Sequence, residues 1–198
     1  MRLVCGFAIA LVALGASGVE YFPAGSLDEK PSRHQFLADW YSEHLAALQE
    51  PSIWQISQQK PAEEVYRFLY LRTFHHPICV RLTIASDGTG LLTSKETNGK
   101  GGFRTGTLVR NTTGKLSKDH IQLFREQLDH FGFWELPTQD PEGPTGTDGA
   151  KWIMEASKGG RYHIVDRWSP PCNDPIHYLG TTMMIDLARF PLLYEEVY

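Results

Sequence analysis

Apolar residues recur every three or four positions in three stretches of the chain, which is the spacing of an amphipathic helix. In the first stretch, Ser32 followed by Gln35 matches a capping box, and Pro51 marks the end. In the last, Asp174 before Pro175 is a typical helix start. The pattern therefore predicts three helices, over residues 32–50, 117–131 and 174–189.

Between these stretches the apolar residues alternate or form short runs rich in aromatic and branched side chains, which is typical of β-strands. Asp87-Gly88 and Asn98-Gly99 are hairpin signals. The connections between the first four of these strands are too short to hold a crossover, so these four should be antiparallel. We expect six strands, over residues 65–74, 78–85, 91–97, 103–109, 150–157 and 161–169.

The order of these segments predicts the fold class. One helix precedes four strands, a second helix follows them, and two further strands lead to the third helix. This order favours an α+β domain that has an antiparallel sheet of about six strands with helices packed on one face. We expect the domain to span residues 32–198, after a polar linker at residues 19–31.

The hairpin at residues 150–169 gives the clearest strand signal. A three-residue turn at 158–160 would bring the apolar sets of its two strands to one face, with Met154 opposite Ile164. The same register sets Glu155 opposite His163 on the other face. This predicts either an acid–base pair, in which a carboxylate orients an imidazole, or a solvated cross-strand ion pair.

Further polar side chains near this hairpin could take part in acid–base chemistry. Asp166 is predicted on the same face as Trp152, where a buried carboxylate would need a partner. A structural ion pair is therefore the alternative to a catalytic role for such residues. The catalytic candidates are Glu155, His163, Asp148, Asp166 and Arg167.

Motifs for metal, nucleotide or covalent chemistry are missing from the sequence. His75 and His76 are the main candidates for metal ligands, but adjacent residues of an extended chain point apart, so we expect no metal site. No phosphate-binding loop or nucleophile elbow occurs, and we expect no cofactor. Cys79 and Cys172 could form a disulfide in an oxidising compartment, or remain as two reduced cysteines.

Residues 1–18 have the layout of a secretory signal peptide. Arg2 supplies a positive start, residues 3–14 form an apolar run, and Ala16-Ser17-Gly18 resembles a cleavage site. The apolar run is too short to span a bilayer, which needs about 20 residues. We therefore expect an exported protein, periplasmic or extracellular, with no stable membrane insertion once the signal peptide is removed.

Composition and charge narrow the choice of partner. Hydrophobic residues make up 41% of the 198 residues, enough for one domain with a sizeable core. The net charge of −4 argues against a nucleic-acid partner, which needs a basic face. Aromatic residues are plentiful, at 12%, and could either pack in the core or stack on a protein, peptide or glycan. The candidates for such binding are Trp152, Tyr162 and Trp168.

A resemblance to uncharacterised bacterial exported proteins is carried by the segments YRFLYLRTFHHPICVRL, FWELP and DGAKWIMEASKGGRYHIVDRWSP. The resemblance implies export and a domain of sheet and helices, and it implies no activity. With no catalytic motif and many aromatic residues, the sequence favours a non-enzymatic binding or interaction domain. The alternatives are a small hydrolase or metal-dependent enzyme using the hairpin at 148–167, and a structural component of the cell envelope.

Overall fold

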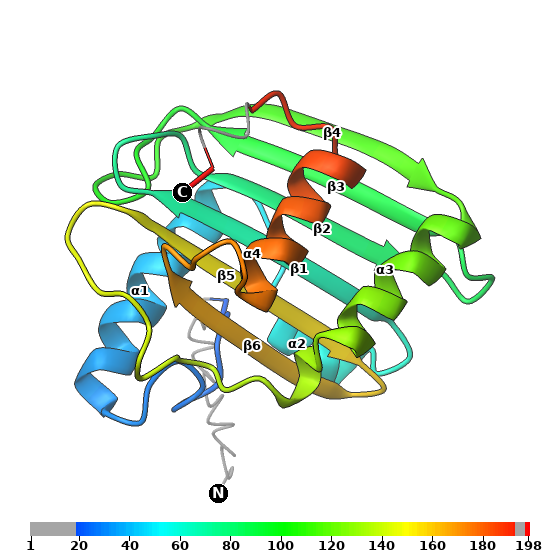
Figure 1. Cartoon of the computed structure of the whole chain (residues 1–198), viewed down its shortest axis with the longest axis horizontal. Helices are drawn as coiled ribbons and strands as arrows, with labels where there is room; N and C mark the ends of the chain where they lie inside the picture. Colours follow the sequence, from blue (N-terminus) through cyan, green and yellow to red (C-terminus); the bar gives the residue numbers. More distant parts are fainter. Residues whose placement is uncertain (1–18, 193–196) are drawn as a thin grey trace, which may run out of the picture.

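Six strands form one antiparallel sheet in the order β4-β3-β2-β1-β5-β6 (Figure 1). The computed structural model describes residues 19–192 and 197–198, so the predicted signal peptide lies outside the described residues. The predicted α+β class and antiparallel sheet are confirmed. The strands are β1 (Glu64–Arg72), β2 (Ile78–Ile84), β3 (Gly90–Thr97), β4 (Leu108–Leu116), β5 (Ala150–Lys158) and β6 (Arg161–Trp168).

The helices cover both faces of the sheet, which corrects the expectation that they pack on one face. α3 (Lys118–His130), α4 (Pro175–Thr181) and the π-helical turn η2 (Thr182–Leu187) lie on one face. α1 (Pro31–Ala47) and α2 (Ile53–Gln59) lie on the other (Figure 1). β1 and β5 are buried along almost their whole length, and strands with side chains buried on both faces need cover on both. Within the described range, no helix combines the length and apolarity needed to cross a membrane.

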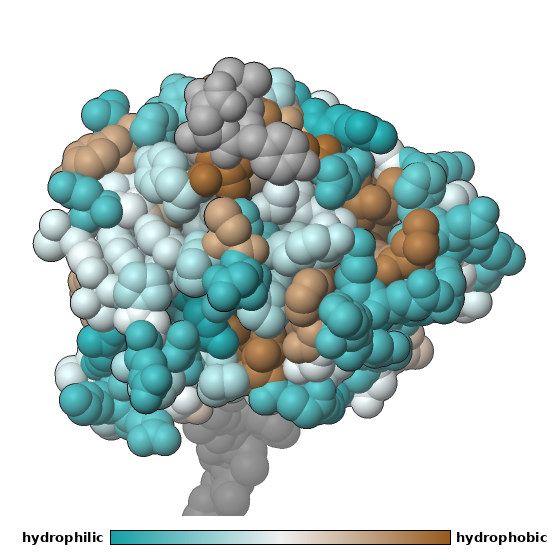
Figure 2. Space-filling view, in the orientation of Figure 1, coloured by the Kyte–Doolittle hydropathy of each residue, from teal (hydrophilic) through white to brown (hydrophobic). Residues whose placement is uncertain are grey.

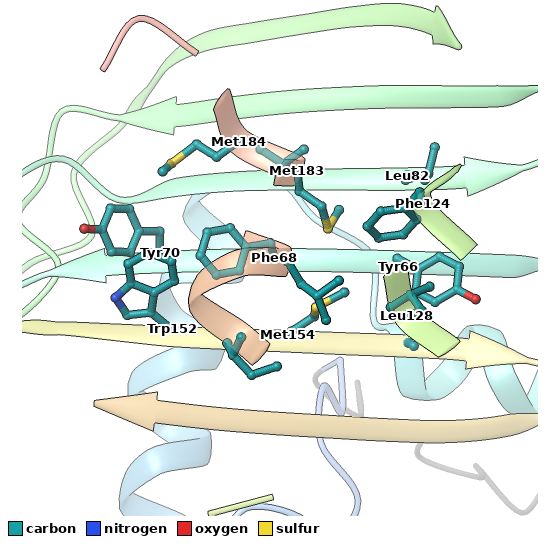
Figure 3. Packing of buried hydrophobic residues seen from close by; sticks show 14 of the residues in the cluster. Tyr66, Phe68, Tyr70, Leu82, Phe124, Leu128, Trp152, Met154, Met183 and Met184 are labelled. Carbon is teal, nitrogen blue, oxygen red and sulfur yellow. The ribbon is translucent and has the colours of Figure 1, made fainter. Parts of the chain in front are cut away.

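The core beneath α3 and α4 combines aliphatic side chains with a group of aromatic rings and methionines (Figure 3). Phe68 and Trp152 point into it from neighbouring strands, and Met183 and Met184 cover them from η2. Trp152 is fully buried, and its indole Nε1 donates to the main-chain oxygen of Tyr198 at 3.1 Å. This predicted binding residue is therefore a core residue.

The outer surface over α3 and α4 is mostly hydrophilic. Figure 2 shows hydrophobic residues on this face as separate patches among hydrophilic side chains. Leu123 of α3 and Tyr178 of α4 are among its exposed apolar residues. Such scattered exposure is ordinary for a folded protein and does not indicate a docking surface.

A second core lies between the sheet and α1. Leu37, Tyr41 and Leu45 of α1 recur at four-residue spacing and are buried against Leu69 and Ile153 of the sheet. Residues 19–30 also pack here, although the sequence predicted a linker. Their buried side chains are Tyr21, Phe22 and Leu27.

Charged side chains are buried beside this second core. Arg67 of β1 is fully buried and donates from Nε to Glu155 of β5 at 2.9 Å. Glu50, in the connection between α1 and α2, accepts from Arg81 of β2 at 2.8 Å and from Lys95 of β3 at 2.7 Å. We call these five residues the buried ion network.

The buried ion network fixes the α1–α2 connection to the sheet. Arg67 also donates to the carbonyl oxygen of Pro51 at 2.6 Å, and Lys95 donates to that of Gln49 at 2.7 Å. The main chain on both sides of Glu50 is thus bonded to sheet residues. Buried charges that are fully paired need not stabilise a fold, but the loss of one partner is costly.

The β5–β6 hairpin has a register that differs by one residue from the predicted one. Its turn contains two residues, Gly159 and Gly160, with φ of +61° and +78°. Positive φ at both positions is the requirement of a type I′ turn, and Gly-Gly meets it without strain. Glu155 is consequently opposite Ile164, and Ala156 is opposite His163. Since adjacent residues of a strand face opposite ways, Glu155 and His163 lie on different faces of the sheet.

The fourth strand also begins later than predicted. Residues 98–107 form a loop, closed by Asn98, whose Oδ1 accepts from the main-chain N of Thr107 at 2.9 Å. β4 follows as an edge strand with mostly exposed side chains, and so it lacks the apolar alternation that marks a half-buried strand. The first helix begins at Pro31, and Ser32 does not cap it.

The possible disulfide between Cys79 and Cys172 is not formed. Cys79 is buried on β2 in the second core, whereas Cys172 is exposed in the loop that follows β6. Both are free thiols. Burial raises the pKa of Cys79 well above its usual value, so its thiol is held in the neutral form.

Replacing Arg67 with methionine should strongly destabilise the protein. Glu155 would remain buried without its cationic partner, and breaking a buried pair in this way costs about 3–5 kcal/mol. The double variant Arg67→Met/Glu155→Leu removes both charges and should regain most of the loss. Urea unfolding followed by circular dichroism measures both free energies. A single variant as stable as the wild type would contradict this role.

Candidate binding groove

A groove runs between α1, the loop 98–107 and the loop 137–149. It consists of two adjoining pockets, with volumes of about 400 Å³ and 570 Å³, which we call the inner and the outer pocket. In Figure 1 the loop 137–149, in yellow, passes beside α1 near the end of β6. The two pockets share Phe36, Trp40, Thr147 and Trp168.

Helix α1 carries two apolar stripes, and only one of them is fully buried against the sheet, whereas Trp40 of the other is partly buried. Phe36 and Trp40 form the second stripe, with their ring centroids 6.1 Å apart. The Phe36 side chain is 65% exposed. Docking of a surface helix needs a single apolar stripe, which Leu37 and Tyr41 supply. The second stripe is therefore available to line the groove.

Trp40 is held in place by the loop 98–107. Its indole Nε1 donates to the carbonyl oxygen of Gly101 at 2.9 Å. Gly101 lies so close to β1 that a Cβ at this position would come within 2.6 Å of the carbonyl oxygen of Arg72. One turn further along α1, His44 is buried near the same glycine, and burial lowers its pKa from 6.5 to about 4.

The loop 137–149 is fastened along the outer edge of β6. The main-chain N of Asp166 donates to the carbonyl oxygen of Thr138 at 2.7 Å, and the guanidinium of Arg167 donates to the same oxygen at 2.9 Å. At the other end of the loop, Thr73 donates to the carbonyl oxygen of Gly149 from both N and Oγ1, at 2.9 Å each. These bonds cover the strand edge and fix the wall of the groove.

Asp166 organises the floor of the inner pocket. Its buried carboxylate accepts from Lys151 at 2.9 and 3.1 Å, from Tyr41 at 2.8 Å and from Gln139 at 2.9 Å. Burial, followed by the charge of Asp166, raises the pKa of Tyr41 well above its usual value. Asp166 thus joins α1, β5 and the loop 137–149 through one carboxylate. It lies on the α1 face of the sheet, not on the Trp152 face as predicted.

The structure gathers some of the predicted site residues and separates others. The acid–base pair of Glu155 and His163 is not formed, because the two side chains face opposite ways. His163 packs against Phe133 with ring centroids 5.1 Å apart, and burial, then Arg161, lowers its pKa. The predicted residues that do line the groove are Asp148, Asp166, Arg167 and Trp168.

The other candidates lie outside the groove. The Tyr162 hydroxyl donates to Glu155 at 2.9 Å, and its ring packs against that of Trp54 in α2. His75 Nδ1 is 2.7 Å from the hydroxyl of Tyr198, and His76 Nδ1 is 3.0 Å from Glu96. Among residues 19–192 and 197–198, no group of three or more His, Cys, Asp or Glu side chains is arranged to hold a metal ion.

Three aromatic residues of the groove were not predicted as a binding surface: Phe36, Trp40 and Phe103. The first two lie in the predicted helix at residues 32–50, whose apolar spacing indicates packing on the rest of the domain. A signal for their role was present, because Phe36 and Trp40 lie directly before Leu37 and Tyr41 and widen the apolar stripe beyond what docking requires.

Comparison with known proteins adds no assignment. No family model matches the chain, and no curated protein sequence matches it. The resemblance to exported proteins therefore stays a prediction. The function has to be argued from the chemistry of the groove itself.

Lowering the pH should loosen α1 through His44. The pKa of His44 is about 4 in the folded protein and near 6.5 when the chain is unfolded, so the unfolded state binds the proton first. The contribution of neutral His44 to the free energy of unfolding is fully present above pH 6.5. It decreases as the pH drops towards 4, by up to about 3 kcal/mol. Urea unfolding across this range should show a shallower loss in His44→Gln. An unchanged slope in the variant would contradict the assignment.

Proposed function

We propose that the protein is a non-enzymatic interaction domain that binds a peptide segment in the groove. The observation that carries the proposal is the pair of adjoining pockets that share the rings of Phe36, Trp40 and Trp168. Tryptophan and phenylalanine offer large contact areas with few rotatable bonds, and such rings dominate the energetics of peptide and protein recognition. These rings are held by a framework that exists before any ligand arrives, which lowers the entropic cost of binding.

The wall of the inner pocket favours a peptide over other ligands. In the described part of the chain, the main chain of residues 144–148 makes no hydrogen bond to another main-chain group. Residues 144–147 line the inner pocket, and their C=O groups and the N–H groups of all but Pro144 could pair with the main chain of a ligand. Arg33 and Asp140 add charges of both signs at the inner pocket. A peptide supplies amide groups for the loop and side chains for the aromatic rings.

Selection from a displayed library of random peptides tests the proposal. Peptides selected on the wild type should bind Phe36→Ala about tenfold more weakly, since the ring would no longer cover the ligand. Tyr178→Ala is the matched control, because this ring is 47% exposed on α4, outside the groove. Binding that Phe36→Ala leaves intact, or that Tyr178→Ala weakens equally, would refute peptide binding in the groove.

We also infer export, from the signal-peptide layout of residues 1–18. Expressed at full length in a bacterium, the protein should be recovered outside the cytoplasm, with Val19 at its amino terminus. Cell fractionation followed by amino-terminal sequencing measures both. A cytosolic protein that retains Met1 or Arg2 would contradict export.

A further inference from the structure

The outer pocket has a composition that differs from that of the inner pocket. Its walls carry four aromatic rings, those of Phe36, Trp40, Phe103 and Trp168. Three acidic residues line it as well, Asp39, Glu43 and Asp148, and no lysine or arginine does. The inner pocket instead combines Arg33, Lys151 and Arg167 with Asp140, Asp166 and Asp174.

The acidic groups of the outer pocket are not neutralised by neighbouring cations. Among the salt bridges within the described part of the chain, none involves Asp39, Glu43 or Asp148. Asp39 accepts a hydrogen bond from the neutral amide of Gln35 at 2.8 Å. By contrast, Asp166 and Asp174 in the inner pocket each have a cationic partner. Within the described residues, the three carboxylates of the outer pocket therefore have no ion-pair partner, and they lie beside the exposed rings of Phe36 and Phe103.

Aromatic rings and carboxylates attract the same kind of group. The face of an aromatic ring is the negative part of its quadrupole, so a cation over it is stabilised, most strongly over tryptophan. Carboxylates at the same pocket add a longer-range attraction. An anionic ligand would be repelled by both, and a neutral apolar ligand would leave the carboxylates without a partner. Charge complementarity thus selects a cation.

We propose that the outer pocket is a subsite for a lysine or arginine side chain of the bound peptide, an inference that rests on the proposed function. The pocket opens into the inner pocket through four shared residues, Phe36, Trp40, Thr147 and Trp168. A cation in the outer pocket can therefore belong to a chain that continues along the groove. The ring of Phe103, 69% exposed, stands at the outer wall, where the methylene stem of a long basic side chain would pack.

Two matched peptides test the subsite, an acetylated and amidated Leu-Ala-Lys-Ala-Leu and its analogue with norleucine in place of lysine. The analogue keeps the aliphatic stem and removes the charge. Titration followed by the indole N–H signals of Trp40 and Trp168 in heteronuclear NMR spectra gives both affinities. The lysine peptide should bind about tenfold more tightly than the norleucine peptide.

Variants that lack acidic side chains show whether the preference for the lysine peptide arises in the outer pocket. Glu43→Gln/Asp148→Asn should reduce the lysine preference to about twofold, because it leaves the rings and removes two of the three acids. Glu126→Gln/Asp129→Asn removes the same charge from the exposed side of α3, away from the groove, and should leave the preference unchanged. A preference lost equally in both variants would reflect net charge alone and would overturn the subsite.

The remaining outcomes separate this inference from the proposed function. Binding of both peptides with equal affinity would overturn the cationic subsite and leave the peptide groove standing. Failure of both peptides to shift either indole signal would count against peptide binding itself. Tetramethylammonium ion that binds as tightly as the lysine peptide would show a site for a small free cation and would overturn the assignment to a peptide side chain.

Discussion

Helix α1 forms one wall of the groove, and charges buried beneath the end of the helix hold it on the sheet. Glu50 accepts from Arg81 and Lys95, and Arg67 binds both Glu155 and the main chain that follows Glu50. An apolar interface alone would tolerate sliding of the helix, whereas these bonds are directional. They give α1 one position along the sheet, and that position brings Phe36 and Trp40 beside the loop 137–149.

A single buried carboxylate, that of Asp166, connects the elements on the opposite side of the groove. Asp166 uses one carboxylate to join α1 through Tyr41, β5 through Lys151 and the loop 137–149 through Gln139. Its own main-chain N holds the loop at Thr138. The two walls are therefore connected through Asp166, and Phe36, Trp40 and Trp168 line the groove above it.

The sequence predicted those features that depend on local periodicity. The helix at Ser117, the helix at Pro175 and the strands β1 to β3 follow from apolar spacing and lie close to their expected positions. The second face of the sheet was missed because Arg67 and Glu155 are charged, and charged residues are usually exposed. Their burial depends on partners in other strands, which no local pattern records. The hairpin register turned on whether Lys158 belongs to the turn, and apolar alternation alone could not decide this.

The groove was predictable only where its residues lie close together in the sequence. Asp148, Asp166, Arg167 and Trp168 come from one hairpin and its preceding loop. The first three were marked by their charge and Trp168 by its aromatic ring. Phe103 and Trp40 come from segments that only the folded sheet brings together. Their meeting depends on Gly101, which fits against β1 because it has no side chain.

Because Cys79 is buried, its reactivity towards a thiol reagent depends on whether α1 is docked on the sheet. Cys79 is a β2 residue buried in the second core, whereas Cys172 is exposed to solvent. A thiol reagent therefore modifies one of these two cysteines in the intact fold and both once the helix lifts away. The rate at which Cys79 is modified therefore measures how often α1 leaves the sheet, and no engineered probe is needed.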